Sequence, residues 1–305
     1  MCRKFQQLLL TIVIIALSGT TTSAFAGPFR MLVESNNDSD AGSEVFQVSF
    51  ADFDGVLNAT FLDSGFTDIN IGPQFSIAGL AYDGAYRMLV ESNDDRDGGS
   101  EVFAATYDSY DDLIAGNIDD GAFTQLNIGP NFSIGGLAYD GNFRMLVESN
   151  EDRPAGSEVF AISYESFDDL LSATFMSGGF SAINIGPVFD IGGFVFDGAY
   201  RMLLESNDDR AAGSEVFQAS FANFDEVLTS TFLSTGFTDL NIGPNFGVRG
   251  FAYEPDVLVA VPEVRAASLM GLAFAVLLML RLRSPCPQAN GGVRRPFDLR
   301  GLMFS

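Results

Sequence analysis

Acidic and amide side chains gather in one loop of the chain with the spacing of a calcium ligand set. Asn93, Asp95 and Asp97 stand at alternate positions, and Gly98 follows them. Calcium binds several oxygen ligands, and a glycine after the third ligand permits the sharp turn of such a loop. Ala104 stands where a bidentate glutamate is expected. We interpret the segment first as a solvated hairpin loop whose Asn and Asp side chains bind its own backbone. The alternative is a weak calcium site with these three residues as ligands.

A second set of ionisable residues holds one arginine and two glutamates and recurs four times. Arg87 and Glu91 share one face of a predicted strand, and Glu101 lies on the next strand. Because a guanidinium can bind two carboxylates, the set predicts structural ion pairs between repeats. The alternative is an ion site in a central channel. The members are Arg30, Glu34, Glu44, Arg87, Glu91, Glu101, Arg144, Glu148, Glu158, Arg201, Glu205 and Glu215.

These arginines reveal an internal repeat. Each lies 57 residues after the previous one, and a fixed period of this length marks a repeat architecture. Every repeat predicts four strands with one helical turn before the fourth, and an Asn-Ile-Gly-Pro-x-Phe segment predicts the bend that follows. In the second repeat these elements are strand 77–82, an Asp-Gly hairpin at 83–84, strand 86–91, strand 101–107, a helical turn at 109–115 and strand 123–128.

Four-stranded antiparallel repeats predict an all-β fold, a four-bladed β-propeller built from four 57-residue repeats. The first repeat lacks its opening strand, and the missing copy stands at the far end as Val248–Tyr253. A C-terminal strand that completes the first blade closes the ring and removes exposed sheet edges. The alternatives are an open stack of repeats and a larger ring made by dimerisation.

The composition of residues 27–256 restricts the function. This region contains eight arginines, no lysine, no histidine and 38 acidic residues, a net charge of −30 against −24 for the whole chain. Such a charge excludes nucleic acid as a partner. The region also has no cysteine, because Cys2 and Cys286 lie outside it. Many aromatic and β-branched residues indicate a folded domain rather than a disordered one.

Catalysis in this domain would depend on carboxylates. Identical acids in all four repeats indicate a structural role, whereas a glycosidase needs one unique acid pair. Asp119, Asp120 and Glu165 are the candidates for a polysaccharide hydrolase. We expect instead a non-enzymatic binding or structural protein without a cofactor. A calcium-stabilised surface module is the second hypothesis, and the hydrolase is the third.

The N-terminus has the plan of a secretory signal peptide. Arg3 and Lys4 precede a short apolar run, and Ala24 and Ala26 form an A-x-A cleavage site. The alternative is an N-terminal membrane anchor, but the apolar run is too short to span a membrane. We expect the mature chain to begin at Gly27, outside the cytoplasmic membrane.

The C-terminal region carries a second targeting pattern. Pro262 and Glu263 precede fifteen uncharged, mostly apolar residues from Ala266 to Leu280, and arginines follow. This segment resembles the PEP-CTERM sorting signal, although Val264 replaces the second proline. The resemblance implies an exosortase-type membrane enzyme as partner, and extracellular polysaccharide as surroundings.

The length and charge of this tail agree with a transient anchor. Fifteen helical residues span about 22 Å, short of a ~30 Å hydrocarbon core. The arginines after the apolar run favour a cytoplasmic end. A plain C-terminal membrane anchor is the alternative. The predicted divisions are a signal peptide at 1–26, the propeller at 27–256 (repeats 27–83, 84–140, 141–197 and 198–254), a sorting segment with a hydrophobic helix at 257–283 and a basic cytoplasmic tail at 284–305.

Overall fold

The structure is a computed structural model of the 305-residue chain. It describes residues 27–35, 43–72, 74–92, 100–149, 157–186, 188–206, 214–243 and 246–255. The predicted signal peptide, the sorting segment with its hydrophobic helix and the basic tail lie outside these residues.

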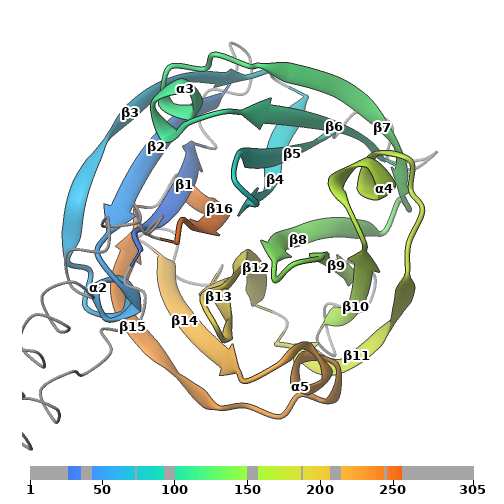
Figure 1. The fold of residues 1–305 in the computed structure, drawn as a ribbon. Helices are drawn as coiled ribbons and strands as arrows, with labels where there is room; N and C mark the ends of the chain where they lie inside the picture. The colour runs from blue at the N-terminus through green and yellow to red at the C-terminus, as the bar shows by residue number, and fades with distance from the viewer. Residues whose placement is uncertain are drawn as a thin grey trace, which may run out of the picture. The chain divides into compact units, whose positions relative to one another are not determined.

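The described residues form four four-stranded antiparallel sheets arranged as blades around a centre (Figure 1). The predicted all-β, four-bladed propeller is therefore confirmed. From the innermost strand outward, blade 1 holds β16 (Phe246–Tyr253), β1 (Phe29–Ser35), β2 (Ser43–Phe50) and β3 (Phe61–Ile71), and blade 2 holds β4 (Phe75–Tyr82), β5 (Tyr86–Ser92), β6 (Ser100–Tyr107) and β7 (Asp120–Ile128). Blade 3 holds β8 (Phe132–Tyr139), β9 (Phe143–Ser149), β10 (Ser157–Tyr164) and β11 (Ser177–Ile185), and blade 4 holds β12 (Phe189–Phe196), β13 (Tyr200–Ser206), β14 (Ser214–Phe221) and β15 (Ser234–Ile242).

The closing strand lies where the phase of the repeat predicts it. β16 pairs with β1 from Phe29 opposite Tyr253 to Ser35 opposite Phe246. The amide of Glu254 also donates to the carbonyl of Pro28 at 3.1 Å. The ring closes within one chain, so neither an open stack nor a ring made by dimerisation describes this domain.

A short helix joins the third and fourth strands of every blade, as predicted. Each begins after an Asp, Ser or Asn whose side chain accepts a hydrogen bond from a backbone amide of the first turn. Each helix contacts the outermost strand of the preceding blade. The helices are α2 (Phe53–Leu57), α3 (Tyr110–Ile114), α4 (Phe167–Leu171) and α5 (Phe224–Thr229).

The two turn predictions also agree with the structure. Gly84 adopts φ of 115° in the hairpin after β4, a conformation that favours glycine. The Gly-Pro segment forms the bend between blades, where the amide of Phe132 donates to the carbonyl of Gly129 at 2.9 Å. The outermost strand of blade 2 is longer than predicted. It begins at Asp120 rather than Phe123, because its first residues continue the pairing with β6 as far as Thr106.

The innermost strands β4, β8, β12 and β16 contact one another around the centre. Glycine permits this close approach: a Cβ atom at Gly193 would lie 2.6 Å from the Cβ of Phe251, and one at Gly136 would lie 2.7 Å from the Cβ of Phe194. The phenylalanine or leucine of one strand thus fills the space above the glycine of its neighbour. Four blades leave little room at the axis, and this pairing of large and small residues fills it.

Candidate functional site

Each arginine of the repeated set binds the acidic residue at the end of the innermost strand of its own blade. Arg87, Arg144 and Arg201 form ion pairs of 3.1 to 3.2 Å with the aspartate four residues earlier. Arg30 has no such neighbour, and its Nη2 lies 3.1 Å from Glu254 at the end of β16. The ion pair therefore joins neighbouring strands of one sheet. In blade 1 it fastens the end of the closing strand.

The same arginines also reach the next blade. The guanidinium carbon of Arg30 lies 3.9 Å from the centroid of the Tyr110 ring on α3. Arg87, Arg144 and Arg201 lie 4.5 to 4.8 Å from phenylalanine rings at the corresponding position of α4, α5 and α2. A guanidinium over an aromatic face is attracted by the ring quadrupole. These contacts run around the whole ring, so each arginine ties its blade to the following one.

The first glutamate of each set makes a second connection between blades. Glu34, Glu91, Glu148 and Glu205 are only 3–6 % exposed. The Oε2 atom of each accepts a hydrogen bond of 2.9 to 3.1 Å from a backbone amide of the innermost strand of the next blade. A buried carboxylate needs such donors. The four donors are Ile77, Ile134, Ile191 and Val248.

The structure thus separates the residues that the sequence groups together. The arginine binds at the hairpin end of the blade, and the first glutamate binds near the opposite end of the innermost strand. The second glutamate of each set lies at an exposed position of the third strand. These exposed residues are Glu44, Glu101, Glu158 and Glu215. Sequence reasoning missed the acidic partner, although an Asp stands four residues before three of the four arginines.

Two tyrosine hydroxyls complete the connections at the hairpin end. Tyr86 in blade 2 donates to Oε2 of Glu254 in blade 1 at 2.6 Å. Tyr200 in blade 4 donates likewise to Asp140 in blade 3. Burial, and then the bond to the carboxylate, raise the pKa of both tyrosines far above its usual range. Phenylalanine stands at the same place in blades 1 and 3, so only alternate junctions carry this bond.

One arginine departs from the repeat at the centre of the ring. Arg249 on β16 stands where the other innermost strands have alanine or glycine. Its guanidinium folds against Gly247, where a Cβ atom would lie 3.2 Å from Nη2. Its Nε is buried and has no hydrogen-bond partner among the described residues. Comparison of the four copies of this strand in the sequence could have identified Arg249, because only this copy has a charged residue at the position.

The remaining sequence candidates divide into exposed residues and residues outside the described part. Asp119, Asp120 and Glu165 are exposed, and Asp119 accepts a hydrogen bond from the amide of Asp108. Three sets of predicted residues lie outside the described part of the chain. They are the candidate calcium ligands Asn93, Asp95 and Asp97, the cleavage-site residues Ala24 and Ala26, and the sorting-motif residues Pro262 and Glu263. Within the part that the structure describes, no three His, Cys, Asp or Glu side chains cluster as a metal site, and none of its helices is long and apolar enough to cross a membrane.

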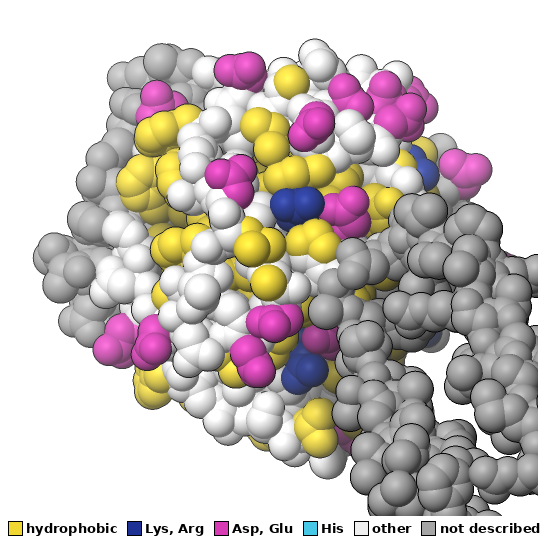
Figure 2. Space-filling model, turned by 60° about the vertical axis from the view of Figure 1, so that its left-hand side comes forward, with side chains coloured by type: hydrophobic (Ala, Val, Ile, Leu, Met, Phe, Trp, Pro, Cys, Tyr) yellow, Lys and Arg dark blue, Asp and Glu magenta, His cyan; other side chains and the backbone are white. Residues whose placement is uncertain are grey.

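The flank of the propeller exposes large apolar side chains. They stand at repeated positions at and before the outermost strands, and Phe66, Phe123, Phe180 and Phe237 are 59–63 % exposed. Each of these rings packs edge-on against a phenylalanine of the neighbouring strand. Figure 2 shows apolar side chains on one side of the molecule, with acidic groups between them. The flank therefore combines apolar surface with negative charge.

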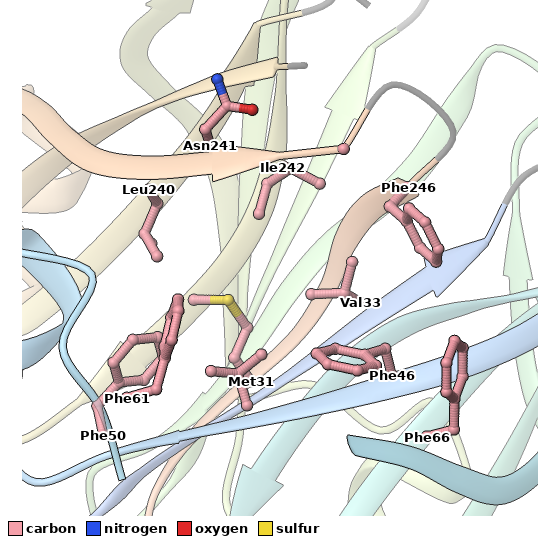
Figure 3. A pocket seen from close by; sticks show the side chains of 12 residues that line it. Met31, Val33, Phe46, Phe50, Phe61, Phe66, Leu240, Asn241, Ile242 and Phe246 are labelled. Carbon is pink, nitrogen blue, oxygen red and sulfur yellow. The ribbon is translucent and has the colours of Figure 1, made fainter. Parts of the chain in front are cut away.

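Apolar grooves run along this flank between neighbouring blades. The groove at blade 1 has a volume of about 290 Å³ and lies between β1, β2 and β3 on one side and β15 on the other. Figure 3 shows Met31 and Phe61 of blade 1 below Leu240 and Ile242 of β15. Corresponding grooves of about 480 and 270 Å³ lie at blades 2 and 3. Their lining is suited to apolar groups.

No protein-family model matches the chain, and no curated protein matches it. Among solved structures, the chain is similar to TolB from Acinetobacter baumannii, with a TM-score of 0.32 and 9 % identity over 70 % of this chain. It spans 44 % of that protein. It is also similar to the GH43 endo-arabinanase from Bacillus licheniformis, with a TM-score of 0.37 and 12 % identity over 70 % of this chain and 79 % of the other. TM-scores this low carry no argument about function.

Proposed function

We propose that the protein is an exported, non-enzymatic binding and structural protein of the cell surface or extracellular matrix. The apolar segment and arginines at the C-terminus support sorting by an exosortase-type enzyme, and the A-x-A site supports export. The propeller is the part that meets other molecules of the matrix, with extracellular polysaccharide as the expected partner.

One observation carries the non-enzymatic part of this proposal. The repeated arginines and buried glutamates bind at the same places in all four blades, and each of them contacts the following blade. Carboxylates that serve proton transfer must be within reach of a substrate, whereas these hold backbone amides of the next blade. A ring closed in this way gives a rigid surface, which lowers the entropy cost of binding.

The test uses the chain from Gly27 to Asp256 on a glycan array, with reducing-sugar release measured on every glycan that binds. We expect retention of an extracellular polysaccharide without cleavage. Sugar release that disappears in Asp119→Asn or Glu165→Gln would replace this proposal with the hydrolase. N-terminal sequencing of the envelope fraction tests the export step, and a chain that begins at Met1 would contradict it.

A further inference from the structure

The groove at blade 2, called here the wide groove, differs from its counterparts in size. Its volume is about 480 Å³, against about 290 and 270 Å³ at blades 1 and 3. Two substitutions within the repeat explain the difference. Ala105 lines it where the grooves at blades 1 and 3 have Val48 and Ile162, and Ile118 stands where blade 1 has Phe61. A volume above about 300 Å³ is typical of sites for small ligands.

The other blades show which group occupies the corresponding space. In blade 1 the ring of Phe61 packs against Phe50, with centroids 5.4 Å apart. Equivalent ring pairs occur in blade 3, between Tyr164 and Phe175, and in blade 4, between Phe221 and Phe232. In blade 2 the inner member is Tyr107, and among the described residues it has no aromatic partner, because Ile118 replaces the phenylalanine. The wide groove thus lacks the ring that Phe61 supplies to the groove at blade 1.

The charge of the lining adds a second requirement for an occupant. Asp68 on β3 lines the wide groove and is exposed. Gln125 and Ala182 stand at the equivalent positions of blades 2 and 3, but blade 4 has Asp239 there. The groove at blade 1 is lined by the residues that follow Asp239 on that strand and not by Asp239 itself, so of these three grooves the wide groove alone is lined by a carboxylate. Among the described residues, no basic side chain lines this groove, and the whole chain carries a net charge of −24. A cationic group next to an aromatic ring complements both the apolar wall and Asp68.

We propose that the wide groove binds a small aromatic ammonium compound. The ring of the ligand takes the place that a phenylalanine occupies in the sister blades, next to Tyr107 and Phe103. Offset or edge-on packing of aromatic rings adds to the gain from burial. The ammonium group lies at Asp68 on the rim, where it remains partly hydrated. This site is independent of the proposed binding of polysaccharide.

The test measures binding of phenethylamine to the full chain by calorimetry and by chemical-shift changes. Butylamine keeps the charge without the ring, and phenylacetate keeps the ring with the opposite charge. We expect both to bind at least about tenfold more weakly than phenethylamine, the ratio for one lost ring contact or charge-assisted bond. Equal binding of butylamine, or of phenylacetate, would overturn the proposal.

Two variants place the ligand in the groove. Ile118→Phe introduces the residue of the other three blades, so it should fold while its ring fills the site and abolishes saturable binding. Asp68→Gln introduces the residue that blade 2 has at the equivalent position. It should lower the affinity for phenethylamine at least about fivefold, and it should not lower the affinity for phenylacetate. Should Ile118→Phe fail to fold, Ala105→Val narrows the same groove and serves in its place. Unchanged affinity in these variants, or no saturable binding by the parent chain at about 10 mM ligand, would refute the site.

Discussion

Glu254 is the side chain by which the closing strand is fastened, and replacing it with alanine tests the closure. Its Oε2 accepts from Nε and Nη2 of Arg30 at 3.3 and 3.1 Å and from the hydroxyl of Tyr86 at 2.6 Å. The side chains of Glu254 and Arg30 are 28 and 19 % exposed, so solvent screens their ion pair. Tyr86 is fully buried, so its hydroxyl bond is the stronger part of this connection.

The expected loss follows from these two parts. An orphaned buried hydroxyl costs about 1–3 kcal/mol, and a partly exposed ion pair contributes about 0.2–1 kcal/mol. Glu254→Ala should therefore lower the free energy of unfolding by about 1–4 kcal/mol. For a domain of this size that corresponds to a fall in Tm of roughly 2–16 °C. Differential scanning calorimetry of the purified chain measures it.

Two matched variants separate the contributions. Tyr86→Phe introduces the residue found at this place in blades 1 and 3. In that background Glu254→Ala orphans no hydroxyl and should cost only about 1 kcal/mol or less. Glu254→Asp introduces the acid of the other three blades and should cost less than alanine. If Glu254→Ala leaves Tm unchanged, or costs the same with and without Tyr86, the reasoning about this connection is wrong.

Three further perturbations test the centre, the tyrosines and the loops. Gly193→Ala should lower the free energy of unfolding, measured in urea, by about 1–3 kcal/mol, because its Cβ would lie 2.6 Å from the Cβ of Phe251. The control Gly236→Ala should leave the free energy of unfolding nearly unchanged, because its Cβ would have no neighbour within 4 Å. Burial raises the pKa of Tyr107 to about 12, so the folded state holds this proton more tightly. Stability should fall as pH rises from about 10, and Tyr107→Phe should make that fall shallower. Millimolar Ca²⁺ should raise Tm more than Mg²⁺ at equal ionic strength, and the combined change of Asp95 and Asp97 to Asn should remove the difference; equal effects of both cations would contradict the calcium site.

The strands, the hairpins and the closure of the ring could be predicted because they depend on local pattern and on phase. Alternation from Tyr86 to Glu91 predicts a strand, Asp83-Gly84 predicts its hairpin, and the missing first strand predicts its copy at the other end. Each of these predictions can be made from a single repeat, or from a comparison of the first repeat with the end of the last one. None of them depends on knowing how the blades pack against one another.

The partners of the ionisable residues could not be predicted in the same way. Arg87 has an acid four residues before it and another four residues after it, and spacing alone does not distinguish them. The structure shows that a tight hairpin brings Asp83 back beside Arg87, while Glu91 reaches an amide of the next blade. The sequence does not show which residues of one blade lie opposite which residues of the next, so a contact between blades such as that of Glu91 cannot be predicted from it. The wide groove escaped notice for a related reason, since Ile118 is an unremarkable residue except in comparison with the other copies.

The pairing of β16 with β1 also determines how the domain bears mechanical load. The amide of Gly27 donates to the hydroxyl of Tyr253, and the amide of Glu254 donates to Pro28, so the chain enters and leaves the ring at one corner. A pull on the chain beyond Pro255 reaches that corner first. When an antiparallel pair is peeled from its end, its hydrogen bonds break one after another rather than together. Force applied through the tail therefore acts on Glu254, with its bonds to blades 1 and 2, before it acts on any strand.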